Sequence, residues 1–179
     1  IFRSFDAGNS WEDISSFNGL PRFPWGMIGL TISPVNSKRI WAMIESDNGG
    51  LYRSDDGGNN WKKINSNRAL RQRAWYYTRI YADSQNEDKI YVMNVSYGVS
   101  KDGGKTFELK NAPHGDHHDL WVDPNNNLRM VIADDGGAQV SNDGGENWTT
   151  YHNQPTAQFY RVTTDNSFPY RIYGAQQDN

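Results

Sequence analysis

Apolar and polar residues alternate along this chain in short runs, and the runs come in pairs. Each pair encloses a segment rich in Pro, Asn, Asp and Ser, the residues that favour turns. Two short β-rich runs around such a turn predict a β-hairpin. The four pairs are residues 29–34 with 39–44, 79–83 with 89–93, 119–124 with 129–133, and 160–165 with 171–174.

A second hairpin signal follows the first at the same period. One short phrase recurs four times, with its serines 41 to 50 residues apart, a spacing typical of propeller blades. Its Ser and Asp oxygens accept backbone N–H groups, its Gly permits positive φ, and its closing aromatic ring can lie between sheets. We therefore expect four strands per unit and a structural role for the repeated residues. These are Ser4, Asp6, Gly8 and Trp11; Ser54, Asp56, Gly58 and Trp61; Ser100, Asp102, Gly104 and Phe107; and Ser141, Asp143, Gly145 and Trp148.

The phrase resembles the Asp-box, or BNR repeat, whose pattern is SxDxGxTW. Ser, Asp and Gly are kept in all four copies, while Ser10, Asn60 and Asn147 replace Thr, and Phe107 replaces Trp. Asp-box propellers include sialidases, xyloglucan-active glycoside hydrolases, sortilin-type receptors and a photosystem assembly factor, so the resemblance specifies fold more strongly than activity. Residues 117–124 and 133–137 look most similar to bacterial secreted proteins labelled glycosyl hydrolase, BNR repeat. That resemblance implies a secreted, periplasmic or cell-surface location, although this sequence contains no signal peptide.

The expected fold is an all-β β-propeller of four-stranded antiparallel blades, with an Asp-box turn between strands 3 and 4 of each blade. The expected units are a half blade at 1–19, blades at about 20–66, 67–112 and 113–154, and a half blade at 155–179. Such an arrangement favours a fragment of a larger propeller. The alternative is that the two half blades pair and close a four-bladed ring.

The amino-acid composition and the charge of the chain argue against several partners and kinds of chemistry. The net charge is −3, with no basic stripe that would indicate nucleic acid, and no apolar run predicts membrane insertion. The absence of Cys excludes disulfides, thiol catalysis and a thiolate zinc site. None of the Asp-box copies supplies the twelfth-position Glu of an EF-hand calcium loop. We therefore expect no metal and no cofactor.

The expected ligand face is the one that carries the loops from strand 4 to the next strand 1 and from strand 2 to strand 3. Its loops are aromatic, acidic and amide-rich, which suits sugar rings and their hydroxyls. The structural alternative is that the aromatic rings fill gaps between blades and that the His side chains are held by neighbouring loops. The candidate ligand-binding residues are Trp25, Trp75, Tyr76, Tyr77, His117, His118, Phe159, Gln176 and Asp178.

Glycoside hydrolysis would require two carboxylates about 5 to 9.5 Å apart. Asp116 or Asp119 in one segment and Asp134 or Asp135 in the next are the candidates. The sialidase signature is not found in the sequence, and the surroundings of the xyloglucanase Asp pair are not recognisable. The resemblance therefore carries over no catalytic residue.

Two function classes remain open. The first is a secreted propeller that binds, and as an enzyme would hydrolyse, a glycan or polysaccharide. The alternative is a non-catalytic propeller that serves as a protein or peptide recognition platform. Whether the chain is an enzyme stays open; if it is one, the resemblance implies a glycoside hydrolase.

Overall fold

The computed structural model describes residues 1–153 and 159–176, and these residues form β-strands with a single 3₁₀ turn. No helix in these two ranges is long and apolar enough to cross a membrane. The elements in chain order are β1 (Phe2–Arg3), β2 (Glu12–Asp13), β3 (Ile28–Ile32), β4 (Ile40–Ile44), β5 (Gly50–Ser54), β6 (Lys62–Asn65), η1 (Arg68–Arg71), β7 (Arg79–Ala82), β8 (Ile90–Met93), β9 (Tyr97–Ser100), β10 (Glu108–Lys110), β11 (His117–Val122), β12 (Met130–Asp134), β13 (Gly137–Ser141), β14 (Phe159–Thr164) and β15 (Ile172–Gln176).

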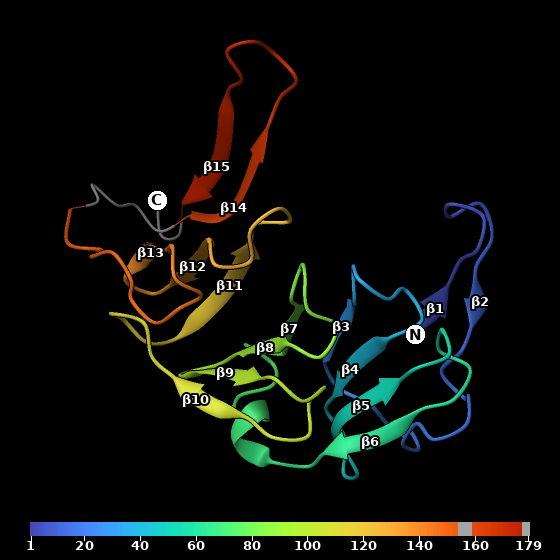
Figure 1. The fold of residues 1–179 in the computed structure, drawn as a ribbon. Coiled ribbons are helices and arrows are strands. Elements are labelled where there is room, and N and C mark those ends of the chain that lie inside the picture. Colours follow the sequence, from blue (N-terminus) through green and yellow to red (C-terminus); the bar gives the residue numbers. More distant parts are fainter. Residues whose placement is uncertain (154–158, 177–179) are drawn as a thin grey trace.

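The strands pair antiparallel with their chain neighbours, as blades of a propeller do. Two sheets have four strands, in the orders β3-β4-β5-β6 and β7-β8-β9-β10. β11, β12 and β13 form a third sheet, and β1-β2 and β14-β15 are two-stranded. The sheets follow one another around an arc, and the two terminal hairpins project from it (Figure 1). The fold is thus all-β and built of successive antiparallel blades.

The third sheet has three strands where the sequence predicts four. The Thr149 N–H donates to the Val140 carbonyl at 3.0 Å, as a fourth strand would. The second hydrogen bond of this residue pair is made by a side chain, because Thr149 Oγ1, and not its backbone carbonyl, accepts the N–H of Val140 at 3.0 Å. A hydroxyl that replaces the backbone acceptor ends the pairing after one backbone bond.

Three hydrophobic cores lie between successive units. The core between the β3–β6 and β7–β10 sheets contains Trp41, Met43 and Leu51 from the first, and Ile80, Ile90 and Val92 from the second. Tyr91, Met93, Leu120 and Ile132 belong to the core between the second and third sheets. Ile14 and Trp61 belong to the core that joins the N-terminal hairpin to the first sheet. Stability therefore depends on contacts between neighbouring blades, as in other repeat folds.

Each of the three Asp-box turns within the blades also accepts a hydrogen bond from the preceding unit. Arg3 Nη1 donates to the Gly57 carbonyl at 2.8 Å, Trp41 Nε1 to Gly103 at 3.0 Å, and the Tyr97 hydroxyl to Gly145 at 3.2 Å. The repeated turn therefore connects blades as well as strands.

Within each turn the Asp carboxylate organises the loop. In the copy at Ser54, the serine hydroxyl donates to Asp56 Oδ1 at 2.8 Å and accepts the Gly58 N–H at 2.9 Å. The Asn60 backbone N–H donates to Asp56 Oδ1 at 2.9 Å, and its side-chain amide donates to Oδ2 at 2.8 Å. The three other copies repeat this set, with Ser10, Thr106 and Asn147 as the side-chain donors. The variable position of the phrase thus keeps a donor, which explains why Ser, Asn and Thr alternate there.

These hydrogen bonds lower the pKa of all four Asp-box carboxyls from 3.8 to about 2. For Asp6, Asp56 and Asp143 the largest cause is the side-chain donor four residues later. At Asp102, burial raises the pKa, but the hydrogen bonds from Thr106 and Ser100 outweigh it. A carboxyl with a depressed pKa in the folded state stabilises the fold above its unfolded pKa and ceases to do so as the pH falls through the folded value.

We therefore expect the midpoint of chemical denaturation to fall steeply as the pH is lowered from about 4 to about 2, the window between the unfolded and folded pKa values. Denaturant titrations followed by Trp fluorescence would measure it. The Asp56→Asn variant, which has no ionisable group at one turn, should show a shallower slope. A midpoint independent of pH across this window would contradict the expectation.

Candidate functional site

Loops from three successive blades meet on the face expected to bind a ligand. The Asn94 side-chain amide, between β8 and β9, donates to the Gln72 carbonyl at 3.1 Å. The backbone N–H of Asp116 donates to the Val95 carbonyl at 3.1 Å. Residues 26 and 27 pair with Glu45 through backbone hydrogen bonds. The loops between strands 2 and 3 of each blade and the loops from strand 4 to the next blade therefore form one continuous surface.

A cleft of about 580 Å³ opens on this surface, and we call it the Trp75 cleft. Trp75 lies on its wall with 71% of the residue exposed. Acidic, basic and amide groups line the rest. The lining residues are Glu45, Ser46, Asp47, Gly49, Lys63, Ser66, Arg68, Arg71, Gln72, Ala74 and Trp75.

The 3₁₀ turn η1 supplies two of the basic residues that line the Trp75 cleft. Asn67 caps this turn by accepting the Ala69 N–H at 3.0 Å, and Leu70 is buried in the core between the first two sheets. Residues three apart in a 3₁₀ turn are eclipsed, so Arg68 and Arg71 project to the same side. Burial and the positive charge of Arg68 lower the pKa of Arg71.

A second cleft of about 410 Å³ adjoins the first and shares Asp47 with it. Its wall includes Phe23, whose ring stacks on Trp25 with the centroids 4.4 Å apart. Trp25 itself is half-buried, donates its indole N–H to the Pro21 carbonyl at 3.1 Å, and packs against the N-terminal core. The ring of Trp25 thus fills a gap between blades, while Phe23 is 63% exposed.

The candidate residues Tyr76, Tyr77 and His118 form one aromatic cluster. The His118 ring stacks on Tyr77 at 5.5 Å and meets the edge of Tyr76 at 4.9 Å between centroids. The Arg73 guanidinium lies over both tyrosine rings. Tyr77 is buried, and its pKa is raised by that burial and by the Asp116 carboxylate. Tyr76 and His118 remain accessible on the ligand face.

Each of the four candidate catalytic acids has a partner inside the chain. Asp119 accepts the Tyr81 hydroxyl at 2.6 Å and the Arg79 guanidinium at 3.1 Å. The other three candidates lie in environments that differ from that of Asp119 and from one another. Asp116 lies 3.9 Å from Arg73, Asp135 is bonded to His118 at 2.9 Å, and the Asp134 carboxylate is buried 3.5 Å from His117 Nδ1.

His117 and His118 are adjacent on a strand and lie on opposite faces of it, and a β-bulge decides which of the two is buried. In the β11-β12 register, His117 pairs with Asp134 and Asp119 pairs with Ala133, so His118 is the extra residue. The bulge turns His117 inward, to the side of Leu120, where it is fully buried against the Tyr97 ring. His117 is therefore inaccessible to a ligand in solvent, whereas His118 is partly exposed.

Three candidates lie in the C-terminal part of the chain. The backbones of Phe159 and Gln176 lie at the β14 and β15 ends that pair with each other, but their side chains are not described. Asp178 lies outside the described residues. Among the residues that are described, no group of three or more His, Asp or Glu side chains has the arrangement of a metal site.

Comparison with known proteins agrees with this architecture. A family model for the BNR/Asp-box repeat matches residues 139–150. The chain has a β-propeller fold, and one of its turns matches the Asp-box repeat. No curated protein sequence matches it.

Solved structures share the propeller fold at low sequence identity. The GH74 enzyme of Niastella koreensis aligns with a TM-score of 0.58 and 14% identity, over 84% of this chain and 26% of that one. The GH74 xyloglucanase of Xanthomonas campestris aligns with a TM-score of 0.52 and 21% identity, over 84% and 25%. YCF48 bound to D1 peptide aligns with a TM-score of 0.60 and 13% identity, over 99% and 56%. The propeller thus spans about a quarter of the two GH74 chains and about half of the YCF48 chain.

The sequence reasoning selected Trp75 and placed the loop that contains Glu45 and Asp47 on the ligand face, but it missed the basic residues of the cleft. The sequence carries no signal for Lys63, Arg68 and Arg71, because their convergence depends on how η1 packs against the β4-β5 loop.

Proposed function

We propose that this propeller binds a glycan in the Trp75 cleft. The observation that carries the proposal is the large exposed face of Trp75 on the wall of a cleft that also presents carboxylate and amide groups. Apolar CH faces of sugar rings pack on such a ring, and Asp47 and Gln72 are placed to bind hydroxyls. Glycan binding is compatible with a secreted, periplasmic or cell-surface location.

The proposal concerns binding and does not include hydrolysis. Glu45 in the cleft is committed to the fold, since its Oε2 accepts the Met27 N–H at 2.9 Å. Asp116, Asp119 and Asp135 are paired with Arg, Tyr or His side chains. The Asp134 carboxylate is buried, and its Oδ1 accepts the Gly136 N–H at 3.0 Å and the Gln139 amide at 3.2 Å. A hydrolytic pair needs one carboxyl that is held protonated and one that is free to act on the sugar or on water.

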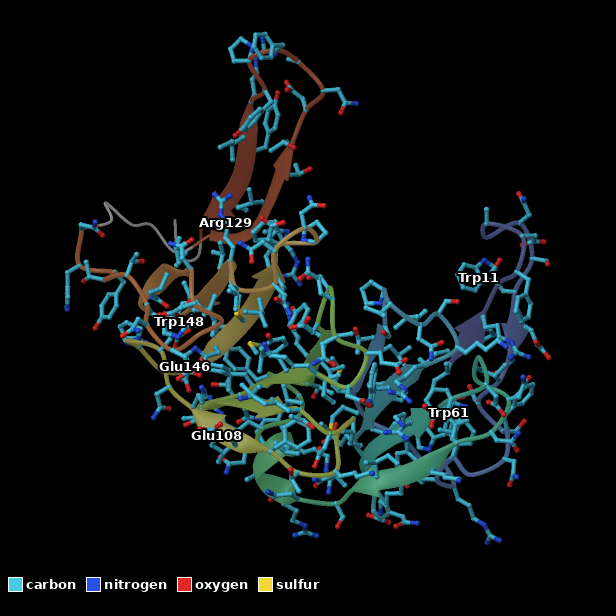
Figure 2. All side chains as sticks on the ribbon, viewed as in Figure 1. Trp11, Trp61, Glu108, Arg129, Glu146 and Trp148 are labelled. Carbon is cyan, nitrogen blue, oxygen red and sulfur yellow. The ribbon has the colours of Figure 1, made fainter. Side chains whose placement is uncertain are left out.

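Trp75→Ala is expected to weaken polysaccharide binding by about tenfold to a hundredfold, because burial of a large aromatic face contributes about 1.5 to 3 kcal/mol. Affinity electrophoresis against a panel of neutral and charged soluble polysaccharides would measure the change. Trp11→Ala is the matched control, since Trp11 is 63% exposed in the distant β1-β2 hairpin (Figure 2). Absence of binding to the whole panel by the folded protein would overturn the proposal, as would equal losses in the two variants.

The second candidate function is recognition of a protein or peptide. The pairing of the candidate acids favours it, because a docking surface does not require a free carboxyl pair. A structural neighbour, YCF48, is bound to D1 peptide. If no glycan binds, this function becomes the leading proposal.

A further inference from the structure

The Trp75 cleft contains three basic side chains that have no acidic partner. No Asp or Glu carboxylate lies within 4.0 Å of Lys63, Arg68 or Arg71 in the part of the chain that the structure describes. The ion pairs found there belong to other residues, namely Arg3, Arg39, Arg53, Arg73, Arg79, Lys89, Lys110, His117, His118, Arg129 and Arg171. Lys63 bonds the Asn48 side-chain oxygen at 2.6 Å, a neutral acceptor. The positive charge on this side of the cleft is therefore not neutralised by a direct contact.

The Arg71 guanidinium is fixed in the wall of the cleft. Leu70 anchors the turn in the core, and a Cβ atom at Gly49 would lie 2.6 Å from Arg71 Nη1, so the group packs closely on the Gly49 backbone. Among the charges near Arg71, the repulsion from Arg68 exceeds the attraction from Glu45. Two guanidinium groups on one side of a short turn form a fork for an anion.

Unused donors at the same place point to a ligand. Arg71 Nε and Ser46 Oγ are both buried, and neither has a hydrogen-bond partner among the described residues. Both residues line the Trp75 cleft. Buried donors without partners cost free energy, and an oxyanion seated against them would satisfy them.

We propose that the Trp75 cleft contains an anion subsite, in which Arg71 and Arg68, with Lys63 and Ser46, bind the carboxylate or sulfate of an acidic polysaccharide. The inference rests on the proposed glycan function and specifies its ligand class. Trp75 packs against a sugar ring, and the guanidinium groups receive that polymer's charged substituent. Arginine suits this task because its planar group donates two parallel hydrogen bonds to one oxyanion.

Paired polymers that differ in charge but share a backbone provide the test. Comparing the binding of polygalacturonate with that of its methyl ester tests recognition of the carboxylate. Comparing dextran sulfate with dextran tests recognition of the sulfate. We expect the protein to bind at least one anionic polymer about tenfold more tightly than its neutral counterpart, and Arg71→Gln to remove most of that difference. Whichever anionic polymer shows the preference identifies the substituent.

Arg129→Gln is the matched control for charge. It removes the same unit of charge from an exposed side chain that lies 4.0 Å from Asp123, far from η1 (Figures 1 and 2). Equal losses in Arg71→Gln and Arg129→Gln would mean non-specific attraction and would overturn the subsite. Equal binding of charged and neutral polymers, with dependence on Trp75 retained, would overturn the subsite and leave the glycan function standing. Binding to none of these four polymers would overturn the subsite, and absence of binding to the whole polysaccharide panel would overturn the glycan function as well.

Discussion

Replacing Trp41 with alanine is expected to lower the free energy of unfolding by about 3 to 5 kcal/mol. Trp41 is fully buried in the core between the first two four-stranded sheets, where it lies with Ile80, Ile90 and Val92. Its indole N–H also donates to the Gly103 carbonyl in the next blade's Asp-box turn at 3.0 Å. Truncation would leave a cavity at one blade interface and remove one of two hydrogen bonds to the Gly103 carbonyl, the other coming from Arg53 Nη1 at 3.2 Å.

Equilibrium denaturation in urea, followed by circular dichroism, would measure the loss. Trp41→Phe keeps most of the ring volume and removes the hydrogen bond, so it should cost about 1 to 3 kcal/mol. Trp11→Ala serves as the exposed control, since it loses only the hydrogen bond to the Gly8 carbonyl at 3.0 Å and should cost about 1 kcal/mol or less. If Trp41→Ala were as mild as Trp11→Ala, Trp41 could not be the residue that holds these blades together.

The parts of the fold that sequence could predict are those set by local chemistry. The Asp-box turns follow from short-range hydrogen bonds among Ser, Asp and the donor four residues later. The strands follow from paired apolar runs between turn-forming residues. Both signals recur at a blade-sized period, and this recurrence was sufficient to predict an all-β propeller.

The parts that sequence could not predict depend on register and packing. One bulge residue, His118, puts His117 on the buried face of β11 with Leu120, where simple alternation would have put His118. One hydroxyl, that of Thr149, ends the fourth strand of the third blade. The convergence of Arg71 on the Trp75 cleft depends on an irregular loop whose conformation no periodic pattern encodes. Composition therefore pointed to the aromatic residue of the Trp75 cleft and gave no signal for the basic ones.

Asp83 holds together the second interface, between the β7–β10 and β11–β13 sheets. Its side chain is fully buried in the β7-β8 loop and accepts the Tyr91 hydroxyl at 3.0 Å and the Asn127 amide of the third blade at 2.7 Å. The Lys89 ammonium lies 3.3 Å from the same carboxylate. Burial raises the pKa of Asp83, but the hydrogen bonds, the largest from Asn127, and the charge of Lys89 outweigh it, so the pKa is lowered.

Asp83→Ala is therefore expected to cost about 3 to 5 kcal/mol, because it leaves the mostly buried Lys89 without its counter-charge and Tyr91 without its acceptor. Asp123→Ala, the corresponding position in the next blade, is the control. Asp123 accepts the Asn125 N–H at 2.8 Å and lies 4.0 Å from the exposed Arg129, so its loss should cost only about 1 kcal/mol. Urea denaturation at neutral pH and at acid pH would compare the two variants with the parent protein.

Since the pKa of Asp83 is lowered in the folded state, the stabilisation it gives is complete above its unfolded pKa and is lost as the pH falls through the folded value. The gap between the parent and Asp83→Ala should accordingly shrink in acid, and equal, pH-independent costs at the two positions would show that Asp83 does not hold this interface.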